Sequence, residues 1–114
     1  MKEISAQGLK TEIEKKENPF TLVDVRDPFV YREKHIPEAV NVPKGADFIK
    51  TLSNTIAAKD TVLVFYDDHE EYNEEVKKLA EQAEAAGYTQ VNVLKDGFLP
   101  WLESGGKVMF GTES

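Results

Sequence analysis

The chain has 114 residues, of which 40% are hydrophobic and 31% charged, a composition typical of one soluble globular domain rather than a disordered segment. Its 14 Lys and Arg against 21 Asp and Glu give a formal net charge of −7, and such a surface repels nucleic-acid phosphates and anionic lipids. The lack of any cysteine excludes disulfides and thiolate metal sites.

Location and domain limits follow from the same simple features. No apolar run approaches the roughly 20 residues needed to span a bilayer, and the first five residues lack the apolar core of a signal peptide. We therefore expect a cytoplasmic protein that binds neither membrane nor nucleic acid. We also expect a single domain over residues 1–114, with its core at about 5–106 and frayed ends at about 1–3 and 108–114.

The first part of the chain alternates between helix-like and strand-like stretches. Ser5 can cap a helix that carries apolar residues at Ala6, Leu9 and Ile13. Thr21–Val25 is apolar and β-branched, which predicts a strand. Asp27 and Pro28 then suit the N-cap and first position of a short helix. Ala39–Pro43 predicts another strand, ended by its proline.

The second part continues this alternation. Apolar spacing predicts a helix over about residues 44–54. Thr61–Tyr66 is continuously apolar, as expected of a central parallel strand covered on both faces. Apolar residues then recur at helical spacing over 76–86, and Gly87 supplies a left-handed stop. Gln90–Leu94 is the last predicted strand.

This order predicts an α/β domain with a mostly parallel central sheet of about five strands, flanked by helices on both faces. In such open sheets, ligands bind beyond the carboxyl ends of the strands. The loop after the central strand is therefore the candidate binding site. Its residues are Asp67, Asp68, His69, Glu70, Glu71, Tyr72 and Asn73.

Two parts of the chain resemble the conserved blocks of the rhodanese family. Thr21–Pro28, followed by His35–Pro43, is similar to the first block, and Asp96–Trp101 is similar to the Gly-Gly-aromatic-x-x-Trp block near the end. The resemblance covers about residues 5–106 and implies the rhodanese-like fold. It also implies a nucleophilic cysteine directly after the central strand, where this chain has Asp67.

A carboxylate cannot replace that thiolate, because it offers no polarisable sulfur atom that could form a persulfide. We predict that the domain has no catalytic residue and no cofactor. It should have neither sulfurtransferase nor cysteine-phosphatase chemistry through a nucleophile of its own. Six carboxylates in nine residues, with no cation before Lys77, also predict a loop that repels anions. These carboxylates are Asp67, Asp68, Glu70, Glu71, Glu74 and Glu75.

The loop residues also have individual interpretations. Asp67 and Asp68 could bind a cation or act as acid and base, but we favour a turn in which one aspartate caps the following helix. His69 could join them in a metal site. No second histidine lies nearby, and the spacing matches neither an EF-hand nor a zinc helix, so we predict no metal.

Residues outside the loop have mainly structural interpretations. His35 is expected to be a polar clasp between loop and strand, not a catalytic residue. Asp24 and Arg26 straddle the end of the first strand and are expected to form an ion pair or to bond the backbone. Tyr66 is expected to cover the core. The alternative is that Tyr66 and Tyr72 flank the loop entrance.

The leading hypothesis is a catalytically inactive rhodanese-like domain that serves as a protein-interaction or regulatory module. Its partner would be a protein with a basic surface, bound at residues 67–75. The alternatives are a small-ligand or cation-binding sensor that uses the same loop, and the non-catalytic half of a sulfurtransferase complex. A reaction based on the carboxylates of Asp67 and Asp68 ranks last, because no oriented base and oxyanion donors accompany them.

Overall fold

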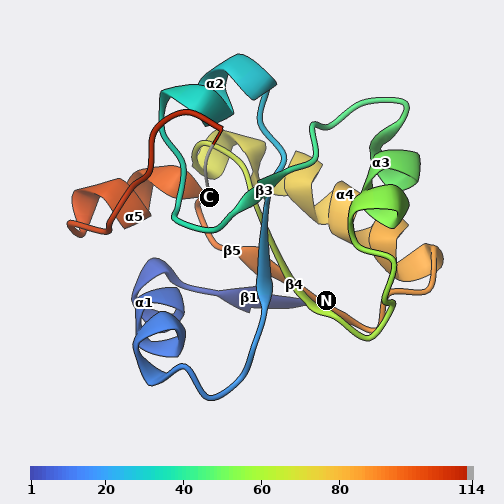
Figure 1. The fold of residues 1–114 in the computed structure, drawn as a ribbon, viewed down its shortest axis with the longest axis horizontal. Coiled ribbons are helices and arrows are strands. Elements are labelled where there is room, and N and C mark those ends of the chain that lie inside the picture. The colour runs from blue at the N-terminus through green and yellow to red at the C-terminus, as the bar shows by residue number, and fades with distance from the viewer. Residues whose placement is uncertain (113–114) are drawn as a thin grey trace.

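The central sheet is parallel throughout and has five strands in the order β1-β5-β4-β2-β3 (Figure 1). The computed structural model describes residues 1–112. The strands are β1 (Lys2–Ile4), β2 (Thr21–Asp24), β3 (Val40–Asn41), β4 (Val62–Tyr66) and β5 (Gln90–Leu94). The helices are α1 (Ala6–Lys15), α2 (Pro28–Glu33), α3 (Phe48–Thr55), a short 3₁₀ turn η1 (Glu70–Tyr72), α4 (Asn73–Ala85) and α5 (Phe98–Glu103).

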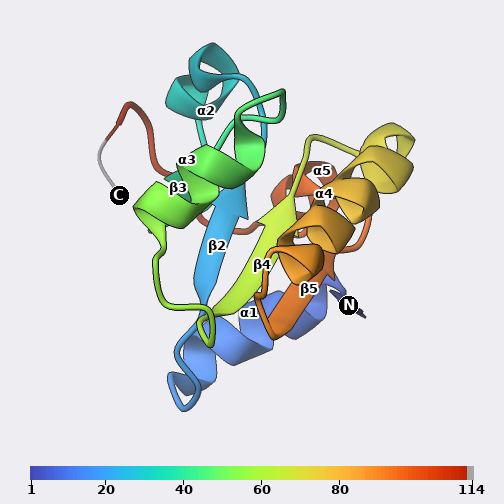
Figure 2. The same cartoon turned by 90° about the vertical axis from the view of Figure 1, so that its right-hand side faces the viewer.

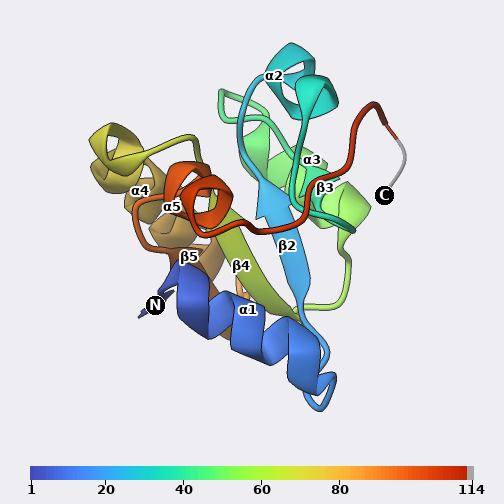
Figure 3. The same cartoon turned by 90° about the vertical axis from the view of Figure 1, so that its left-hand side faces the viewer.

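Helices cover both faces of the sheet, as predicted. Figure 2 shows α3 and α4 on one face, where Phe48, Leu52 and Leu79 pack on the sheet in one hydrophobic cluster. Figure 3 shows α1 and α5 on the opposite face, where Leu9 and Trp101 belong to a second cluster. The sheet is thus buried on both sides, which explains why β4 is apolar along its whole length.

Several local sequence signals correctly predict the start or the end of a helix. The Ser5 hydroxyl accepts a hydrogen bond from the Gly8 amide at 3.0 Å and caps α1. The Asp27 carboxylate accepts one from the Phe29 amide at 2.8 Å, with Pro28 at the first position of α2. Gly87 has a φ of +106° just beyond α4, where a side chain would be strained.

The chain ends differ from the expectation. Residues Lys2–Ile4 are not frayed but form β1, which pairs with β5 in the register Lys2 to Asn92. Toward the other end, Met109 and His35 form an antiparallel bridge, with both backbone hydrogen bonds at 2.9 Å. Neither pairing partner is near in sequence, so local composition gave no sign of them. The predicted fraying of 113–114 lies outside the described residues.

Two element boundaries also differ. The strand predicted at Ala39–Pro43 is reduced to Val40–Asn41, an edge strand paired only with β2. The helix predicted from about residue 44 begins at Phe48. The intervening segment bends at Gly45, whose φ of +147° is incompatible with a helix. This bend keeps Lys44 beside the carboxyl end of the sheet rather than on α3. No helix among residues 1–112 is long and apolar enough to cross a membrane.

Candidate functional site

The loop that follows β4 is fixed at its start by α5. The backbone carbonyls of Asp67 and Asp68 accept hydrogen bonds from the amides of Phe98 and Leu99, each at 2.9 Å. Gly97 allows this contact, because a Cβ atom there would lie 2.5 Å from the Asp67 carbonyl oxygen. Its φ of +73° also favours glycine. The turn at Asp96 and Gly97 is therefore part of the loop's support.

Asp67 is a buried carboxylate with its own cation. Its side chain is only 4% exposed, and one oxygen (Oδ2) lies 2.8 Å from the Lys44 ammonium. The other oxygen (Oδ1) accepts a hydrogen bond from the Asp68 amide at 2.7 Å. Burial opposes the Lys44 cation, but the hydrogen bonds and charges of Asp67 and Glu75 outweigh burial and raise the pKa of Lys44. The carboxylate of the residue that follows the central strand thus already has its partners within the protein.

Lys44 links three parts of the loop region. Its ammonium nitrogen lies 2.8 Å from Glu75 on α4, the same distance as from Asp67. It also lies 4.3 Å from the ring centroid of Tyr72, a cation–π distance. Lys44 therefore ties the start of the loop to the first turn of α4.

Arg26 forms a second cationic centre under the loop. Its guanidinium binds both oxygens of Asp24, the shortest contact being 2.7 Å, which confirms the ion pair predicted from sequence. It also donates to Asp68 at 3.1 Å and to the Lys34 carbonyl at 2.7 Å. Burial works against the charge, yet Asp24 outweighs it and raises the pKa of Arg26 above its ordinary value. The guanidinium of Arg26 thus neutralises the carboxylate of Asp68.

The remaining loop residues point in different directions. The rings of His69 and Tyr72 contact each other in a tilted arrangement with centroids 4.9 Å apart, and both residues are half-buried. Asn73 exchanges two hydrogen bonds with Asp96, at 2.9 and 3.2 Å, which joins α4 to the turn before α5. Glu70 and Glu71 are exposed in η1. Only this part of the predicted site faces solvent as free carboxylate.

The expected capping role of an aspartate is wrong. Neither η1 nor α4 has a side-chain cap, because Asp67 and Asp68 are engaged by Lys44 and Arg26 instead. Tyr66 does not flank the loop but is fully buried, and its hydroxyl accepts the Ile36 amide at 3.2 Å. Half-buried Tyr72 lies in the loop itself.

His35 has the contacts of a structural residue. It is fully buried, and its ring stacks on Tyr31 at a centroid distance of 3.9 Å. Its Nδ1 lies 3.0 Å from the Tyr31 carbonyl oxygen, and its backbone pairs with Met109. The clasp therefore joins α2 to the C-terminal segment.

Lys44 is the main residue that sequence reasoning missed. Along the chain, the first cation after the loop is Lys77, whereas the cations that pair with the loop come from the segments after β2 and β3. The available signal was topological, since residues that follow parallel strands meet at one edge of the sheet. Lys44 comes directly after the proline that ends the strand predicted at 39–43. The strong anion repulsion expected of the whole loop is therefore reduced at Asp67, Asp68 and Glu75.

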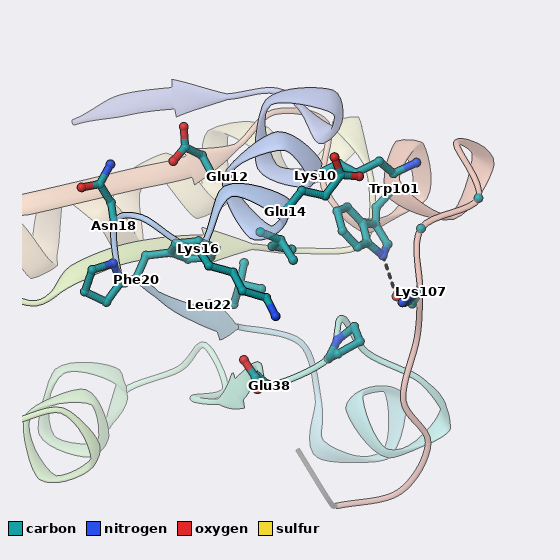
Figure 4. Close-up of a pocket in the computed structure, with 15 residues that line it drawn as sticks. Lys10, Glu12, Glu14, Lys16, Asn18, Phe20, Leu22, Glu38, Trp101 and Lys107 are labelled. Carbon is teal, nitrogen blue, oxygen red and sulfur yellow. Dashed lines mark hydrogen bonds between the residues drawn. The ribbon is translucent and has the colours of Figure 1, made fainter.

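Away from the loop, the described residues offer a groove but no metal site. No group of three or more His, Asp or Glu side chains among residues 1–112 is placed to hold a metal ion. A groove of about 1010 Å³ lies away from the loop, between α1, β2 and the segment after α5 (Figure 4). Trp101 forms part of its wall and donates to the Lys107 carbonyl at 2.8 Å. The charged residues that line the groove are three lysines and three glutamates: Lys10, Lys16, Lys107, Glu12, Glu14 and Glu38.

Comparison with known proteins identifies the family and agrees with the fold. The family model for the rhodanese-like domain matches residues 5–104, and the chain belongs to that family. The Alr3790 protein of Anabaena sp. is 28% identical, with a TM-score of 0.82 over 94% of this chain and 81% of that one. The BH2092 protein of Bacillus halodurans is 29% identical, with a TM-score of 0.78 over 97% and 77%.

A more distant structure supports the fold alone. The thiosulfate sulfurtransferase of Pseudomonas aeruginosa is 20% identical, and the match covers 97% of this chain and 20% of that chain, with a TM-score of 0.79. The comparison with curated proteins found no significant match. The chain is thus a rhodanese-like domain without cysteine, and cysteine-based sulfurtransferase chemistry is excluded for it.

Proposed function

We propose that this rhodanese-like domain is catalytically inactive and acts as a protein-interaction or regulatory module. The partner is a protein with a basic surface, which docks on the exposed part of the loop and the first turn of α4. The observation that supports this proposal is the division of the acidic residues of the loop and α4 into a paired group and an unpaired group. Asp67, Asp68 and Glu75 are paired with cations, whereas Glu70, Glu71 and Glu74 have no ion-pair partner within residues 1–112.

This division supports docking in two ways. The inner pairs hold the loop against the sheet, so that a partner meets a surface that is already ordered and loses little entropy on binding. The outer carboxylates are exposed within five residues of one another and attract a basic segment, most strongly at low salt. The half-buried rings of His69 and Tyr72 contact each other in the same loop and supply an aromatic contact.

The cation-sensor alternative has less support from the site. A Ca²⁺ ion needs six to eight oxygen ligands. Three of the loop's carboxylates are already paired with Lys44 or Arg26. Binding a metal there would break those pairs. A carboxylate-based reaction is disfavoured for the same reason, since Asp67 and Asp68 are both held in ion pairs.

The test is an amide NMR titration of the full chain with a hexalysine peptide, and separately with Ca²⁺ and Zn²⁺. We expect saturable shifts at residues 69–75 with the peptide and none with the metals. The triple variant Glu70→Gln, Glu71→Gln, Glu74→Gln should bind the peptide at least tenfold more weakly, with a smaller salt dependence. Asp68 is left unchanged, because it is paired with Arg26.

A matched control removes the same charge elsewhere. Glu14, Glu17 and Glu103 are also exposed and lie on or near α1 and α5, so their replacement by Gln lowers the net negative charge equally. We expect this control to keep most of the peptide affinity. Equal weakening in both triple variants would show a general charge effect and contradict docking at the loop, and saturable metal shifts at residues 67–75 would favour the sensor instead.

A further inference from the structure

The carboxylate of Asp67 is bound in the manner of a small ligand. Each of its two oxygens has its own donor: the Lys44 ammonium at 2.8 Å and the Asp68 amide at 2.7 Å. Both donors belong to segments that are fixed independently of this side chain. The Lys44 amide donates to the Val25 carbonyl at 3.0 Å, and the Asp68 carbonyl accepts from Leu99 at 2.9 Å.

We propose that Lys44 and the Asp68 amide form a binding site for a small carboxylate anion, and that the side chain of Asp67 is its built-in occupant. The ligand class follows from the donors, since one ammonium and one amide match the two oxygens of a single carboxylate. The intact protein therefore keeps the site closed to free anions. This inference does not depend on partner docking, which concerns the exposed carboxylates of Glu70, Glu71 and Glu74.

The burial of the site makes the occupant necessary. Asp67 is almost fully enclosed, so its removal leaves a cavity with a polar lining rather than an open surface. Glu75 remains on Lys44, but its side chain is 51% exposed and fills none of that cavity. An anion of matching size can then restore the contacts that the side chain made.

The test replaces the side chain by a free anion of the same shape. Asp67→Ala removes the carboxylate group alone, and formate has the size of that group. Asp67→Gly removes the carboxylate group together with its Cβ atom, and acetate has the size of both. We expect formate to raise the unfolding midpoint of Asp67→Ala by about 4 °C at roughly five times its dissociation constant, relative to chloride at equal ionic strength. Acetate should act more strongly on Asp67→Gly than on Asp67→Ala, because the added methyl needs the extra space.

Two controls separate this binding from a general salt effect. The wild-type protein and Glu75→Ala should show no difference between formate and chloride, since the site stays occupied in both. The double variant Lys44→Met, Asp67→Ala should lose the response, because the ammonium is gone. An equal formate effect in the single and double variants, or no effect in either Asp67 variant, would overturn the proposal.

A measurement on the wild type covers the case in which both Asp67 variants fail to fold. Reductive methylation acts on the neutral amine. Two carboxylates pair with the Lys44 ammonium, and they raise the pKa of Lys44 and so favour its charged form. We expect Lys44 to be methylated at least tenfold more slowly than exposed Lys78, as followed by mass spectrometry of peptides. Equal rates at the two lysines would show that Asp67 does not occupy the site and would overturn the proposal.

Discussion

At the scale of single residues, the end of the sheet near the loop contains a compact group of buried polar side chains. Asp24, Arg26 and Tyr66 are each at most 4% exposed. Burial raises the pKa of the Tyr66 hydroxyl, and the negative charge of Asp24 raises it further. Within residues 1–112, every buried side-chain nitrogen and oxygen has a hydrogen-bond partner. Such a satisfied network stabilises one arrangement of the segments that carry it.

The raised pKa of Tyr66 predicts a loss of stability at alkaline pH. The unfolded chain releases this proton near the ordinary value of 10.0, whereas the folded protein retains it. The contribution is therefore fully present below pH 10 and is lost as pH rises through the folded pKa. Tyr66→Phe should cost about 1 kcal/mol at pH 7, because the Ile36 amide loses its acceptor.

The same variant should show a shallower decline of the unfolding free energy between about pH 10 and pH 12 than the wild type. Urea unfolding at a series of pH values measures both effects. A decline as steep in Tyr66→Phe as in the wild type would contradict the assignment of this pH dependence to Tyr66.

At the scale of elements, the loop is placed by contacts with α4 and α5 as well as by β4. The turn before α5 approaches the loop so closely that Gly97 has no room for a side chain. Asn73 and Asp96 link the start of α4 to the same turn. The loop conformation is therefore determined jointly by three elements that are separated in sequence.

Gly97→Ala should be strongly destabilising for two reasons. The added Cβ would lie 2.5 Å from the Asp67 carbonyl oxygen, and the φ of +73° strains any side chain. Together, the steric and backbone terms predict a loss of about 3 kcal/mol of unfolding free energy.

Gly105→Ala is the matched control for this substitution. It has a similar φ of +78° but nothing within 4 Å of its Cβ position, so it should lose only about 1 kcal/mol. Denaturant unfolding of the two variants compares them directly. Equal losses would show that backbone strain alone matters and that the close approach to the loop does not.

At the scale of the whole molecule, the protein keeps the rhodanese-like architecture while the position after the central strand is enclosed. The protein has a net charge of −7, but the inner part of the loop carries little of it, because Lys44 and Arg26 neutralise the carboxylates there. The architecture thus presents an ordered surface at the place where the family resemblance implies a nucleophile.

Restoring a thiol should not restore sulfur transfer. In Asp67→Cys, the sulfur would take the place of a side chain that is 4% exposed, where an attacking reagent has little access. We expect its reaction with a bulky disulfide reagent to be at least roughly tenfold slower in the folded variant than in the urea-unfolded one. Thiosulfate sulfurtransferase activity should stay at background.

The control is an exposed cysteine in the same protein, Glu71→Cys, for which the reaction rate and the sulfurtransferase activity are both measured. This cysteine should react with the disulfide reagent as fast in the folded protein as in the unfolded one. Fast modification of Asp67→Cys together with sulfur transfer would show that the loop opens readily. That result would contradict the closed site described above.

The sequence by itself determined the fold class and the missing chemistry. Apolar periodicity, the caps at Ser5 and Asp27 and the stop at Gly87 act over a few residues, so they can be recognised locally. The absence of cysteine needs no structure at all. Only the tertiary structure decided the state of the loop, because the partners of its carboxylates are distant along the chain. Lys44 is 23 residues from Asp67, and Arg26 is 42 residues from Asp68. Parallel strands bring such segments to one edge of the sheet, and no local pattern encodes which of their charges meet there.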